Sequence, residues 1–564
     1  MRKSFLPIAA ALLLAGTSAT QAQTPQPAIP GMVSAADPRA AEAGAQILRQ
    51  GGNAVDAAIA TLVTLNLVEP QSSGIGGGGY MVFSERGAAP VTYDGRETAP
   101  HAASPDWWLV DGQPMPFDQA QPGGKSVGVP GNLRMLALAH REHGKLAWAA
   151  LFQPAIKLAR DGFKVTNRLH NSLDHYRATG ALSPEARAIF YNADGSARAV
   201  GTVVRNPAFA DFLESVARHG ADSFYVGPNA QAIANTVDGA AHNPSKMTVG
   251  DISTYEAKPR APVCGTYRGY RICGMAPSSS GGITVLATLK QLEPFDLTAL
   301  GQNSPKAWHL IAESERLAYA DRDKYVGDSE FVSVPLAGMA DPAYLATRSA
   351  LISPDKAMAH AEAGTPAGAA PVCAPSVQPE RGTSHFVTVD KWGDVVSETS
   401  TIESSFGSGL MVNGFYLNNE LTDFNFEPVK DGCPTANRVE GGKRPRSSMS
   451  PTIVYGPDGK VRLAVGAAGG STIPAQVIKA IVGVIDFHLT AQQALALPMI
   501  YSPGDTLFVE SGTFLEAMQP QLTAMGHQVK TLPPGTFKAN AIEWRDGRWA
   551  GAADPRSEGA AVSE

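Results

Sequence analysis

Two stretches near the start of the chain carry the residue pattern of helices. Asp37 and the proline after it supply an N-cap and a first helical position, good helix formers follow over 40–48, and Gly51-Gly52 ends the segment. Asn53 then caps a second stretch, 54–67, which ends before a proline. The pattern therefore predicts two consecutive helices.

A glycine-rich run over 71–83 follows these helices and leads into an apolar strand. Gly74, Gly76 and Gly79 satisfy the spacing G-x-G-x-x-G of a dinucleotide loop, but that loop requires the order strand, glycines, helix. The order here is helix, glycines, strand. We therefore interpret the run as a place of close backbone packing and not as a nucleotide-binding loop.

The middle of the chain, about 127–345, is predicted to be mostly helical. Apolar residues recur there at three- and four-residue intervals, for example over 307–325. Within that stretch, the charged run over 313–323 is most simply a charged helix face.

Regular structure stops over 354–382, where alanine, proline and glycine without periodicity indicate a flexible linker. It resumes abruptly with a predicted strand over 385–390, a turn over 391–394 and a second strand over 395–402. The pair Gly382-Thr383 thus lies where a linker meets a β-hairpin.

Composition places the chain among ordinary globular proteins. Of its 564 residues 44% are hydrophobic and 17% are charged, which excludes the disordered and collagen-like classes, and its net charge is −6. Lysine and arginine are scattered without a basic block, so nothing indicates binding to nucleic acid or to an anionic membrane. A small-molecule substrate is the default expectation.

The first 22 residues have the features of an export signal. Arg2 and Lys3 supply positive charge, an apolar run follows over 6–16, and Thr20-Gln21-Ala22 offers a cleavage site. The apolar run is too short to span a bilayer, and no later segment approaches about 18 uninterrupted apolar residues. We expect residues 1–22 to be a signal peptide and the mature protein to be periplasmic or secreted without a membrane anchor.

Export makes the four cysteines informative, because an oxidising compartment allows them to pair. A two-residue turn at Arg268-Gly269 would place Cys264 opposite Cys273 in a β-hairpin, at a non-hydrogen-bonded position where Cα atoms approach to about 4.5 Å. Cys373 and Cys433 are then the second predicted pair. The alternative is four buried free thiols.

Metal binding is not indicated by the sequence. Neither C-x-x-C nor H-E-x-x-H occurs in it. Histidines on the helical patterns, such as His140, His143 and His309, are expected to be structural. No metal site is predicted.

Gly382 and Thr383 form a pair in which self-cleavage is chemically feasible. A threonine hydroxyl can attack the carbonyl carbon of the preceding residue, and a preceding glycine tolerates the strained backbone that the attack requires. The peptide bond becomes an ester, and hydrolysis frees an α-amino group with a pKa of about 7.7–8.0, suited to act as base for the same threonine. The alternative, from these residues alone, is an ordinary strand start.

Blocks of sequence that share one family's order run from about residue 32 to residue 557. They are Gly52-Asn53-Ala54-Val55-Asp56-Ala57-Ala58, Glu69-Pro70 with the glycine run to Gly79, Asp94-Gly95-Arg96-Glu97-Thr98-Ala99-Pro100, Gly128-Val129-Pro130-Gly131, Thr383-Ser384-His385, Leu417-Asn418-Asn419, Arg444-Pro445-Arg446-Ser447-Ser448-Met449-Ser450-Pro451, Gly469-Gly470-Ser471 and Asp554-Pro555-Arg556. Jointly these blocks resemble the γ-glutamyltransferase (glutathione hydrolase) family.

The resemblance implies a proenzyme of the N-terminal-nucleophile hydrolase class with an α+β fold, a four-layer αββα sandwich. The precursor would cut itself between Gly382 and Thr383 into a large subunit, 23–382, and a small catalytic subunit, 383–564, which stay associated. It would transfer the γ-glutamyl group of glutathione or a related amide to the threonine and then to water or to an amino-acid or dipeptide acceptor. No organic cofactor or metal would be required.

The resemblance also implies roles for individual residues. Thr383 would be the nucleophile and Thr401 the residue that orients it, while Gly469 and Gly470 would form the oxyanion hole through backbone N–H groups. Arg96 would grip the substrate carboxylate with two parallel hydrogen bonds. Further substrate-binding positions are Ser447 and Ser448 at that carboxylate and Glu403, Glu420 and Asp423 around the α-ammonium group.

Two departures from the family pattern affect the identity of the donor. Glu403 stands where many members carry Asn, and the surrounding Thr401–Ser404 segment is similar to the related acylase branch. Three carboxylates around one cation repel each other, so either one is protonated through a raised pKa or Glu403 points elsewhere. The segment between Phe424 and Pro445 is also shorter than in members with a well-developed lid, and a bond from Cys433 would tie it to the linker.

Two alternative functions stay open at this level. The first is a related amidohydrolase or acylase that accepts a glutaryl or other acyl group. The second is an uncleaved, catalytically inactive periplasmic binding protein of the same fold.

Overall fold

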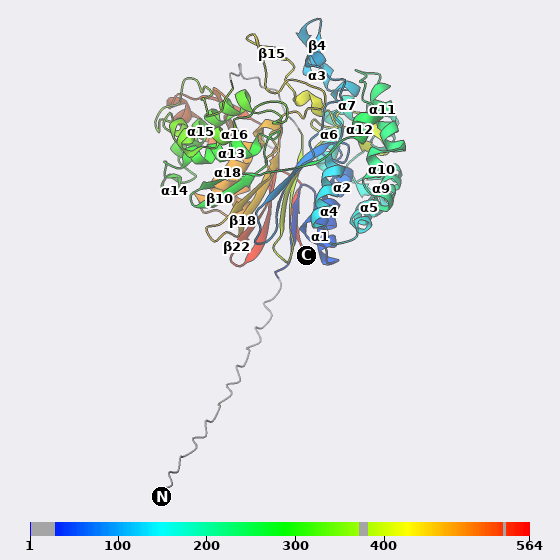
Figure 1. The fold of residues 1–564 in the computed structure, drawn as a ribbon, viewed down its shortest axis with the longest axis horizontal. Coiled ribbons are helices and arrows are strands. Elements are labelled where there is room, and N and C mark those ends of the chain that lie inside the picture. The colour runs from blue at the N-terminus through cyan, green and yellow to red at the C-terminus, as the bar shows by residue number, and fades with distance from the viewer. Residues whose placement is uncertain (2–28, 371–381, 534–536) are drawn as a thin grey trace.

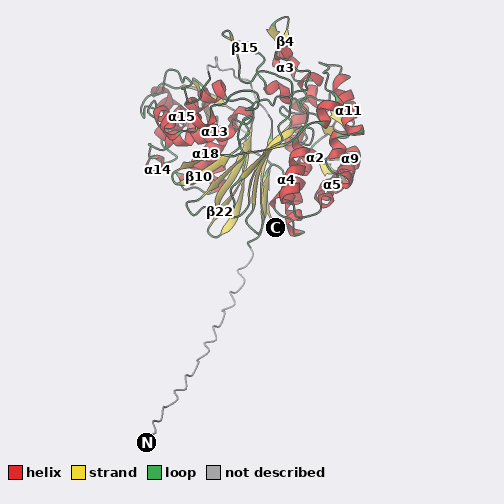
Figure 2. Cartoon of the chain, in the orientation of Figure 1, coloured by secondary structure: helices red, strands yellow, loops and turns green. Residues whose placement is uncertain are grey.

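Two antiparallel β-sheets lie face to face at the centre of the molecule, with helices on the outer face of each (Figure 1). The computed structural model describes residues 29–370, 382–533 and 537–564, together with Met1. Figure 2 shows the strands gathered in the middle and the helices on either side. The layers therefore follow the predicted αββα order.

The first sheet has seven strands and is built around the predicted β-hairpin. Its order is β24 (Ala560–Ser563), β1 (Met32–Ala35), β11 (Ser384–Val389), β12 (Val395–Thr401), β2 (Gly78–Ser84), β3 (Val91–Asp94) and β8 (Lys258–Arg260). The strand β1 pairs with β11 on one side and with β24 on the other. An N-terminal strand is thus held between two strands that follow residue 382.

The second sheet has six strands. Its order is β23 (Arg548–Ala553), β22 (Lys538–Arg545), β18 (Val461–Ala468), β17 (Thr452–Tyr455), β10 (Tyr270–Gly274) and β9 (Val263–Tyr267). Alternate residues of the two sheets form the core between them, because side chains of a strand point to opposite faces in turn. Val387 and Val395 of the first sheet pack there with Ile453, Ala464 and Ile542 of the second.

The helices that cover the first sheet include α1 (Pro38–Arg49), α2 (Ala54–Val68), α4 (Asn132–His143), α5 (Gln153–Asp161) and α9 (Pro207–His219). The predicted caps are confirmed. Asp37 accepts a hydrogen bond from the backbone of Arg39, and Asn53 forms a capping box with Asp56. These caps fix where the two helices begin.

The second sheet is covered by α13 (Gly281–Leu292), α15 (Pro305–Tyr325), α18 (Ile473–Ile485) and α19 (Ala491–Ala496). Apolar side chains from these helices pack on strands β10, β17 and β18. The N-terminus of α18 lies at the end of β18, through the short 3-10 turn η5 (Gly470–Thr472). This connection brings a helix start to the edge of the sheet.

The charged run of α15 is buried, contrary to the interpretation as a charged helix face. Glu313, Arg316 and Arg322 are each at most 2% exposed. Arg316 pairs with Glu313 at 2.7 Å, and Arg322 pairs with Asp323 at the same distance. Paired charges can be buried where isolated ones cannot, so the polar sequence does not report the position of this helix.

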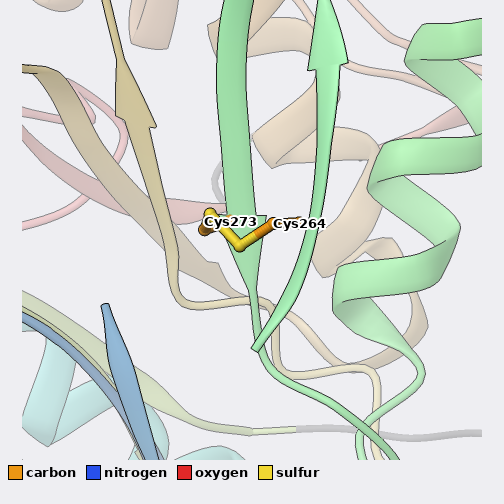
Figure 3. Close-up of a disulfide and its surroundings, with 2 residues drawn as sticks. All are labelled: Cys264 and Cys273. Carbon is orange, nitrogen blue, oxygen red and sulfur yellow. A yellow bond between two sulfur atoms is a disulfide. The ribbon is translucent and has the colours of Figure 1, made fainter. Parts of the chain in front are cut away.

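The predicted disulfide between Cys264 and Cys273 is confirmed (Figure 3). The two residues are direct partners of β9 and β10, with Cα atoms 4.2 Å apart. Arg268 and Gly269 both have positive φ, 53° and 82°, as a two-residue hairpin turn requires. Cys433 is also disulfide-bonded. Its expected partner, Cys373, lies outside the described residues.

The linker predicted over 354–382 is described only up to residue 370 and again at 382. Its described part, 354–370, contains no helix or strand. It is nevertheless held against α15, because the backbone N–H of Met358 donates to Glu313 and that of Gly364 donates to Asp321, each at 2.7 Å. Apart from Met1, the expected signal peptide lies outside the described residues.

The segment expected to form a reduced lid, from Phe424 to Pro445, contains one short hairpin of β15 (Val429–Lys430) and β16 (Cys433–Pro434). It projects at one end of the molecule, near the strand β4 (Leu109–Val110) in Figure 1. Across the described part of the chain, no helix combines the length and the apolar character that crossing a membrane would need.

Candidate active site

Thr383 lies at the entrance to β11, beside the end of β12. Its side chain is 4% exposed, and its Oγ1 lies 3.4 Å from Oγ1 of Thr401. Thr401 is the last residue of β12, and the next pair along the two strands is Ser384 with Ser400. The hairpin register therefore brings together the two threonines that the sequence analysis selected.

The backbone at Gly382 and Thr383 is strained. Gly382 has φ +75°, and a Cβ there would lie 1.6 Å from the carbonyl oxygen of Glu403, so no other residue fits. Thr383 has φ +115°, a conformation that β-branched residues avoid. Such a residue costs about 1–3 kcal/mol and persists only when its surroundings enforce it. The chain thus carries strain at the bond between these two residues.

Gly469 faces this bond from the second sheet. Its backbone N–H donates to the carbonyl oxygen of Gly382 at an N···O distance of 3.4 Å. Gly469 has φ +130°, and Gly470, with φ +57°, opens the turn that leads into α18. Backbone N–H groups at a helix start favour negative charge, so this position suits an oxygen that becomes anionic.

Glu403 contacts Thr401 through its backbone N–H, while its carboxylate is bonded to other side chains. Its N–H donates to Oγ1 of Thr401 at 2.7 Å, in a turn where Glu403 has φ +71°. Its carboxylate accepts from Asn419 at 2.6 Å and from the hydroxyl of Ser404. Glu403 is buried, with 1% of its surface exposed, and these two contacts hold its carboxylate.

Arg96 is buried and bonded to the two acids that were expected to surround the ammonium group. Its guanidinium pairs with Glu420 and with Asp423, the latter at 2.5 Å. It also donates to the carbonyl oxygens of Pro445 at 3.1 Å and Arg446 at 2.9 Å. The structure therefore brings Arg96, Glu420 and Asp423 into one cluster, as the resemblance implies. In this cluster the two acids form ion pairs with Arg96.

The carboxyl groups of this cluster are crowded. Burial, with the nearby charges of Glu97 and Glu403, raises the pKa of Glu420 well above its ordinary value although Arg96 opposes the shift. Burial also raises the pKa of Glu97. Of the two expected outcomes, the raised pKa of one carboxyl group is thus found at Glu420, while the charge of Glu403 remains close enough to contribute to that shift.

Ser447 and Ser448 follow Arg446 and are buried. The hydroxyl oxygen of Ser447 accepts from the backbone of Met449 at 3.1 Å. Ser448 accepts from the guanidinium of Arg322 at 2.5 Å. The two serines thus adjoin the Arg96 cluster through the backbone of Arg446, and Ser448 joins it to α15.

A cavity of about 980 Å³ opens onto Thr383. Its walls include Gly382, Thr383, Ser404 and Gly469, together with residues of α6 (Asn167–His175). None of Arg96, Glu420, Asp423, Ser447 and Ser448 lines it. The Arg96 cluster, the predicted donor pocket, is therefore not part of the wall of this cavity.

A buried ion pair beside Ser384 was not anticipated from the sequence. Lys538 of β22 pairs with Glu69 at 2.6 Å, and both contact the hydroxyl of Ser384, the residue after Thr383. Burial lowers the pKa of Lys538 to about 8. Burial alone would raise the pKa of Glu69, but Lys538 and Arg168 hold it below its ordinary value. Glu69 belonged to a resembling block, whereas nothing in the sequence singled out Lys538.

Within the described ranges of the chain, one group of side chains has metal-ligating types: His309, Glu313 and His527. His309 and His527 are hydrogen-bonded to each other at 2.7 Å, and Glu313 is paired with Arg316. Burial, with His309 and Arg316 nearby, lowers the pKa of His527 to about 3. The group is a satisfied core cluster, in line with the expectation that His309 is structural.

A strained glycine–threonine bond at the head of a central strand, faced by backbone N–H groups inside an αββα sandwich, defines the N-terminal-nucleophile hydrolase class. The family model described as Gamma-glutamyltranspeptidase matches residues 40–563. The chain belongs to the γ-glutamyltranspeptidase family.

Individual relatives agree with this placement. The glutathione hydrolase proenzyme of Bacillus subtilis (strain 168) is 37% identical over 545 residues, which cover 94% of this chain and 91% of that protein. The Acylase ACY 1 proenzyme of Pseudomonas sp. (strain SE83) is 34% identical over 542 residues, covering 94% and 93%. The crystal structure of cephalosporin acylase from Bacillus halodurans superposes with a TM-score of 0.84 at 27% identity, covering 98% of this chain and 99% of that one.

Proposed function

We propose that this protein is a γ-glutamyltransferase and glutathione hydrolase that is made as a precursor and activates itself by cleavage between Gly382 and Thr383. The observation that carries the proposal is the hydrogen bond from Gly469 to the carbonyl oxygen of Gly382, with the Thr383 hydroxyl at the same bond. The products would be a large subunit, 23–382, and a small subunit, 383–564.

Cleavage begins when Oγ1 of Thr383 attacks the carbonyl carbon of Gly382. The carbonyl oxygen becomes an oxyanion, which the N–H of Gly469 already faces. Collapse forms an ester and breaks the C–N bond, and the threonine nitrogen takes up the proton that the hydroxyl lost. Release of the strain at Thr383 favours this step. Water then hydrolyses the ester and leaves a free α-amino group on Thr383.

Turnover uses the same atoms. The α-amino group of Thr383 accepts the hydroxyl proton while Oγ1 attacks the γ-carbonyl of the donor, and the oxyanion binds at Gly469 and Gly470. Collapse expels the amine, which takes that proton, and leaves a γ-glutamyl ester on the enzyme. Water or an acceptor amine attacks this ester. Thr401 positions Oγ1, and no metal or organic cofactor takes part in the proposed sequence.

The Arg96 cluster suits a zwitterionic α-amino acid. When the donor enters, its α-carboxylate takes the place of Glu420 and Asp423 on Arg96, and its α-ammonium group pairs with those two acids. This exchange gives every charged group an oppositely charged partner, so it avoids leaving an unpaired buried charge. Ser447 and Ser448 would add hydroxyl donors to the carboxylate, and Glu403 would border the ammonium group.

The self-cleavage is tested on purified protein by a denaturing gel and by N-terminal sequencing of the smaller fragment. We expect two fragments, the smaller starting at Thr383. The variant Thr383→Ala should remain a single chain without activity, while Thr383→Ser should still be cut because it keeps the hydroxyl. A single wild-type band, or another start, overturns the assignment and favours an uncleaved binding protein.

A second candidate, an acylase for glutaryl or related groups, is favoured by two observations. Glu420 and Asp423 are paired with Arg96, and acylase relatives align over nearly the whole chain. Release rates from γ-glutamyl and glutaryl anilides separate the two candidates. Equal or faster release from the glutaryl anilide would defeat the ammonium-binding role of Glu420 and Asp423.

Two further features belong to the proposal. Residues 1–22 would direct the precursor to the periplasm or outside the cell. A bond between Cys433 and Cys373 would then connect the small subunit to the large one, because these residues lie on opposite sides of the cleavage point.

A further inference from the structure

One guanidinium at the Thr383 cavity has unused hydrogen-bond donors. Arg168, on α6, lines this cavity and keeps a side-chain exposure of 27%. Its Nε lies 3.3 Å from a carboxylate oxygen of Glu69. Among the described residues, no acceptor is bonded to its two terminal nitrogens. Arg168 can therefore present a two-pronged donor to a molecule in the cavity.

The other cations near this cavity are already committed. Arg556 is bonded to both carboxylate oxygens of Asp554 and also to Glu510. Lys538 is fully buried on Glu69. The single negative charge of Glu69 is therefore shared between two cations, Lys538 and Arg168. An anion at Arg168 would supply the missing charge.

The acid on the same wall does not neutralise Arg168. Glu558 lines the cavity, but its carboxylate accepts a hydrogen bond from the backbone N–H of Arg168 at 3.0 Å. It makes no ion pair with the Arg168 guanidinium in the described part of the chain. The two terminal nitrogens of Arg168 thus keep their positive charge and their N–H donors available to a molecule in the cavity.

We infer that Arg168 binds a carboxylate on the amine portion of the substrate, meaning the leaving group of the donor and the incoming acceptor. The inference rests on the proposed function, in which the γ-glutamyl portion occupies the Arg96 cluster. The open cavity, which Thr383 and Arg168 line and the Arg96 cluster does not, is then the space left for the amine portion. Arg168 would thus make the enzyme prefer amine portions that carry a free carboxylate over otherwise identical ones that lack it.

The test compares two donors that differ only in one carboxylate on the leaving group: γ-glutamyl-3-carboxy-4-nitroanilide and γ-glutamyl-4-nitroanilide. In Arg168→Gln, we expect kcat/KM for the carboxylated donor to fall about 10-fold, mainly through KM, while the uncharged donor changes less than about 2-fold. Arg168→Lys should recover part of the loss, because it keeps the charge without the fork. Arg160→Gln, an exposed arginine on α5 bonded to Asp211 and Glu214, is the matched control.

Acceptors give a second measurement that needs no variant. In the wild type we expect glycylglycine to be a better acceptor than glycylglycinamide by about 10-fold, since the amide lacks the charge. Equal effects of Arg168→Gln on both donors, or equal use of both acceptors, overturn the inference. Failure of the wild type to release nitroaniline from either donor would instead contradict the proposed function.

Discussion

The backbone N–H of Glu403 donates a hydrogen bond to the hydroxyl oxygen of Thr401 at 2.7 Å. This contact fixes the Thr401 hydroxyl beside Thr383, because the other hydrogen-bond partner of that oxygen among the described residues is Oγ1 of Thr383, at 3.4 Å. Glu403 must adopt φ +71° to make it. The turn after β12 therefore positions the Thr401 hydroxyl through a backbone N–H group.

Replacement of that hydroxyl is the first prediction. Thr401→Val keeps the shape of the side chain but removes the group that faces Oγ1 of Thr383. We expect kcat to fall about 100-fold, as for a small misplacement of a reacting group, with slower self-cleavage. Steady-state kinetics and a time course of cleavage measure both effects. Thr401→Ser should stay within a few-fold of the wild type, and full activity of Thr401→Val would remove the orienting role.

The second prediction concerns the buried pair of Glu69 and Lys538. Lys538→Met leaves Glu69 with only Arg168 as a charged partner, and breaking a buried pair costs about 3–5 kcal/mol in the free energy of unfolding. Urea unfolding should show this loss. The double variant Glu69→Gln with Lys538→Met should recover part of it, because no charge is then left alone. If the single and double variants are equally unstable, the two side chains do not act as a pair.

The third prediction concerns the disulfide of the β9–β10 hairpin. Cys264→Ser with Cys273→Ser opens a short loop, for which the chain-entropy estimate is about 2–3 kcal/mol. We expect the free energy of unfolding to fall by up to this amount without loss of activity, since the hairpin lies away from the residues that line the Thr383 cavity. Thermal unfolding of the variant and of the reduced wild type should give matching decreases. A loss of activity at temperatures where the variant is folded would contradict this view.

The fourth prediction concerns acid stability. In the folded protein, burial lowers the pKa of His385 to about 3. Burial and the nearby charges of His309 and Arg316 lower the pKa of His527 to about 3 as well. In the unfolded chain a histidine has a pKa of about 6.5. Between these values the unfolded chain binds more protons, so this part of the stability is complete above about pH 6.5 and falls as the pH drops toward 3.

The test uses His527→Gln, whose amide can still donate to His309. Its free energy of unfolding should depend less on pH between 6.5 and 4.5, by about 2 kcal/mol at most for one group. Urea unfolding at both pH values measures the difference between variant and wild type. An unchanged slope would mean that His527 is not protonated on unfolding in this range.

Local sequence signals account for much of the fold. The caps at Asp37 and Asn53, the turn at Arg268-Gly269 and the hairpin after Thr383 all depend on a few neighbouring residues, and the structure confirms them. The order of layers and the set of site residues came from the family resemblance. Neither follows from periodicity.

Contacts between distant residues were beyond the reach of the sequence. Glu69 and Lys538 are 469 positions apart, and nothing in either segment indicates that they meet. The interpretation of the α15 run as a charged helix face was wrong for a related reason. The hydropathy of a charged residue does not show whether an oppositely charged partner allows it to be buried. The contacts of the Arg96 guanidinium likewise depend on how two distant segments, 420–423 and 445–446, pack around it.

The interleaving of β1 between β11 and β24 bears on the order of events during maturation. If the chain is severed after residue 382, each sheet still contains strands from both pieces, and neither piece retains a whole sheet. Synthesis of the two halves as independent polypeptides would therefore present each with unpaired strand edges and exposed core. Continuity of the polypeptide would serve as a scaffold for assembly, one that becomes dispensable once the strands have locked together.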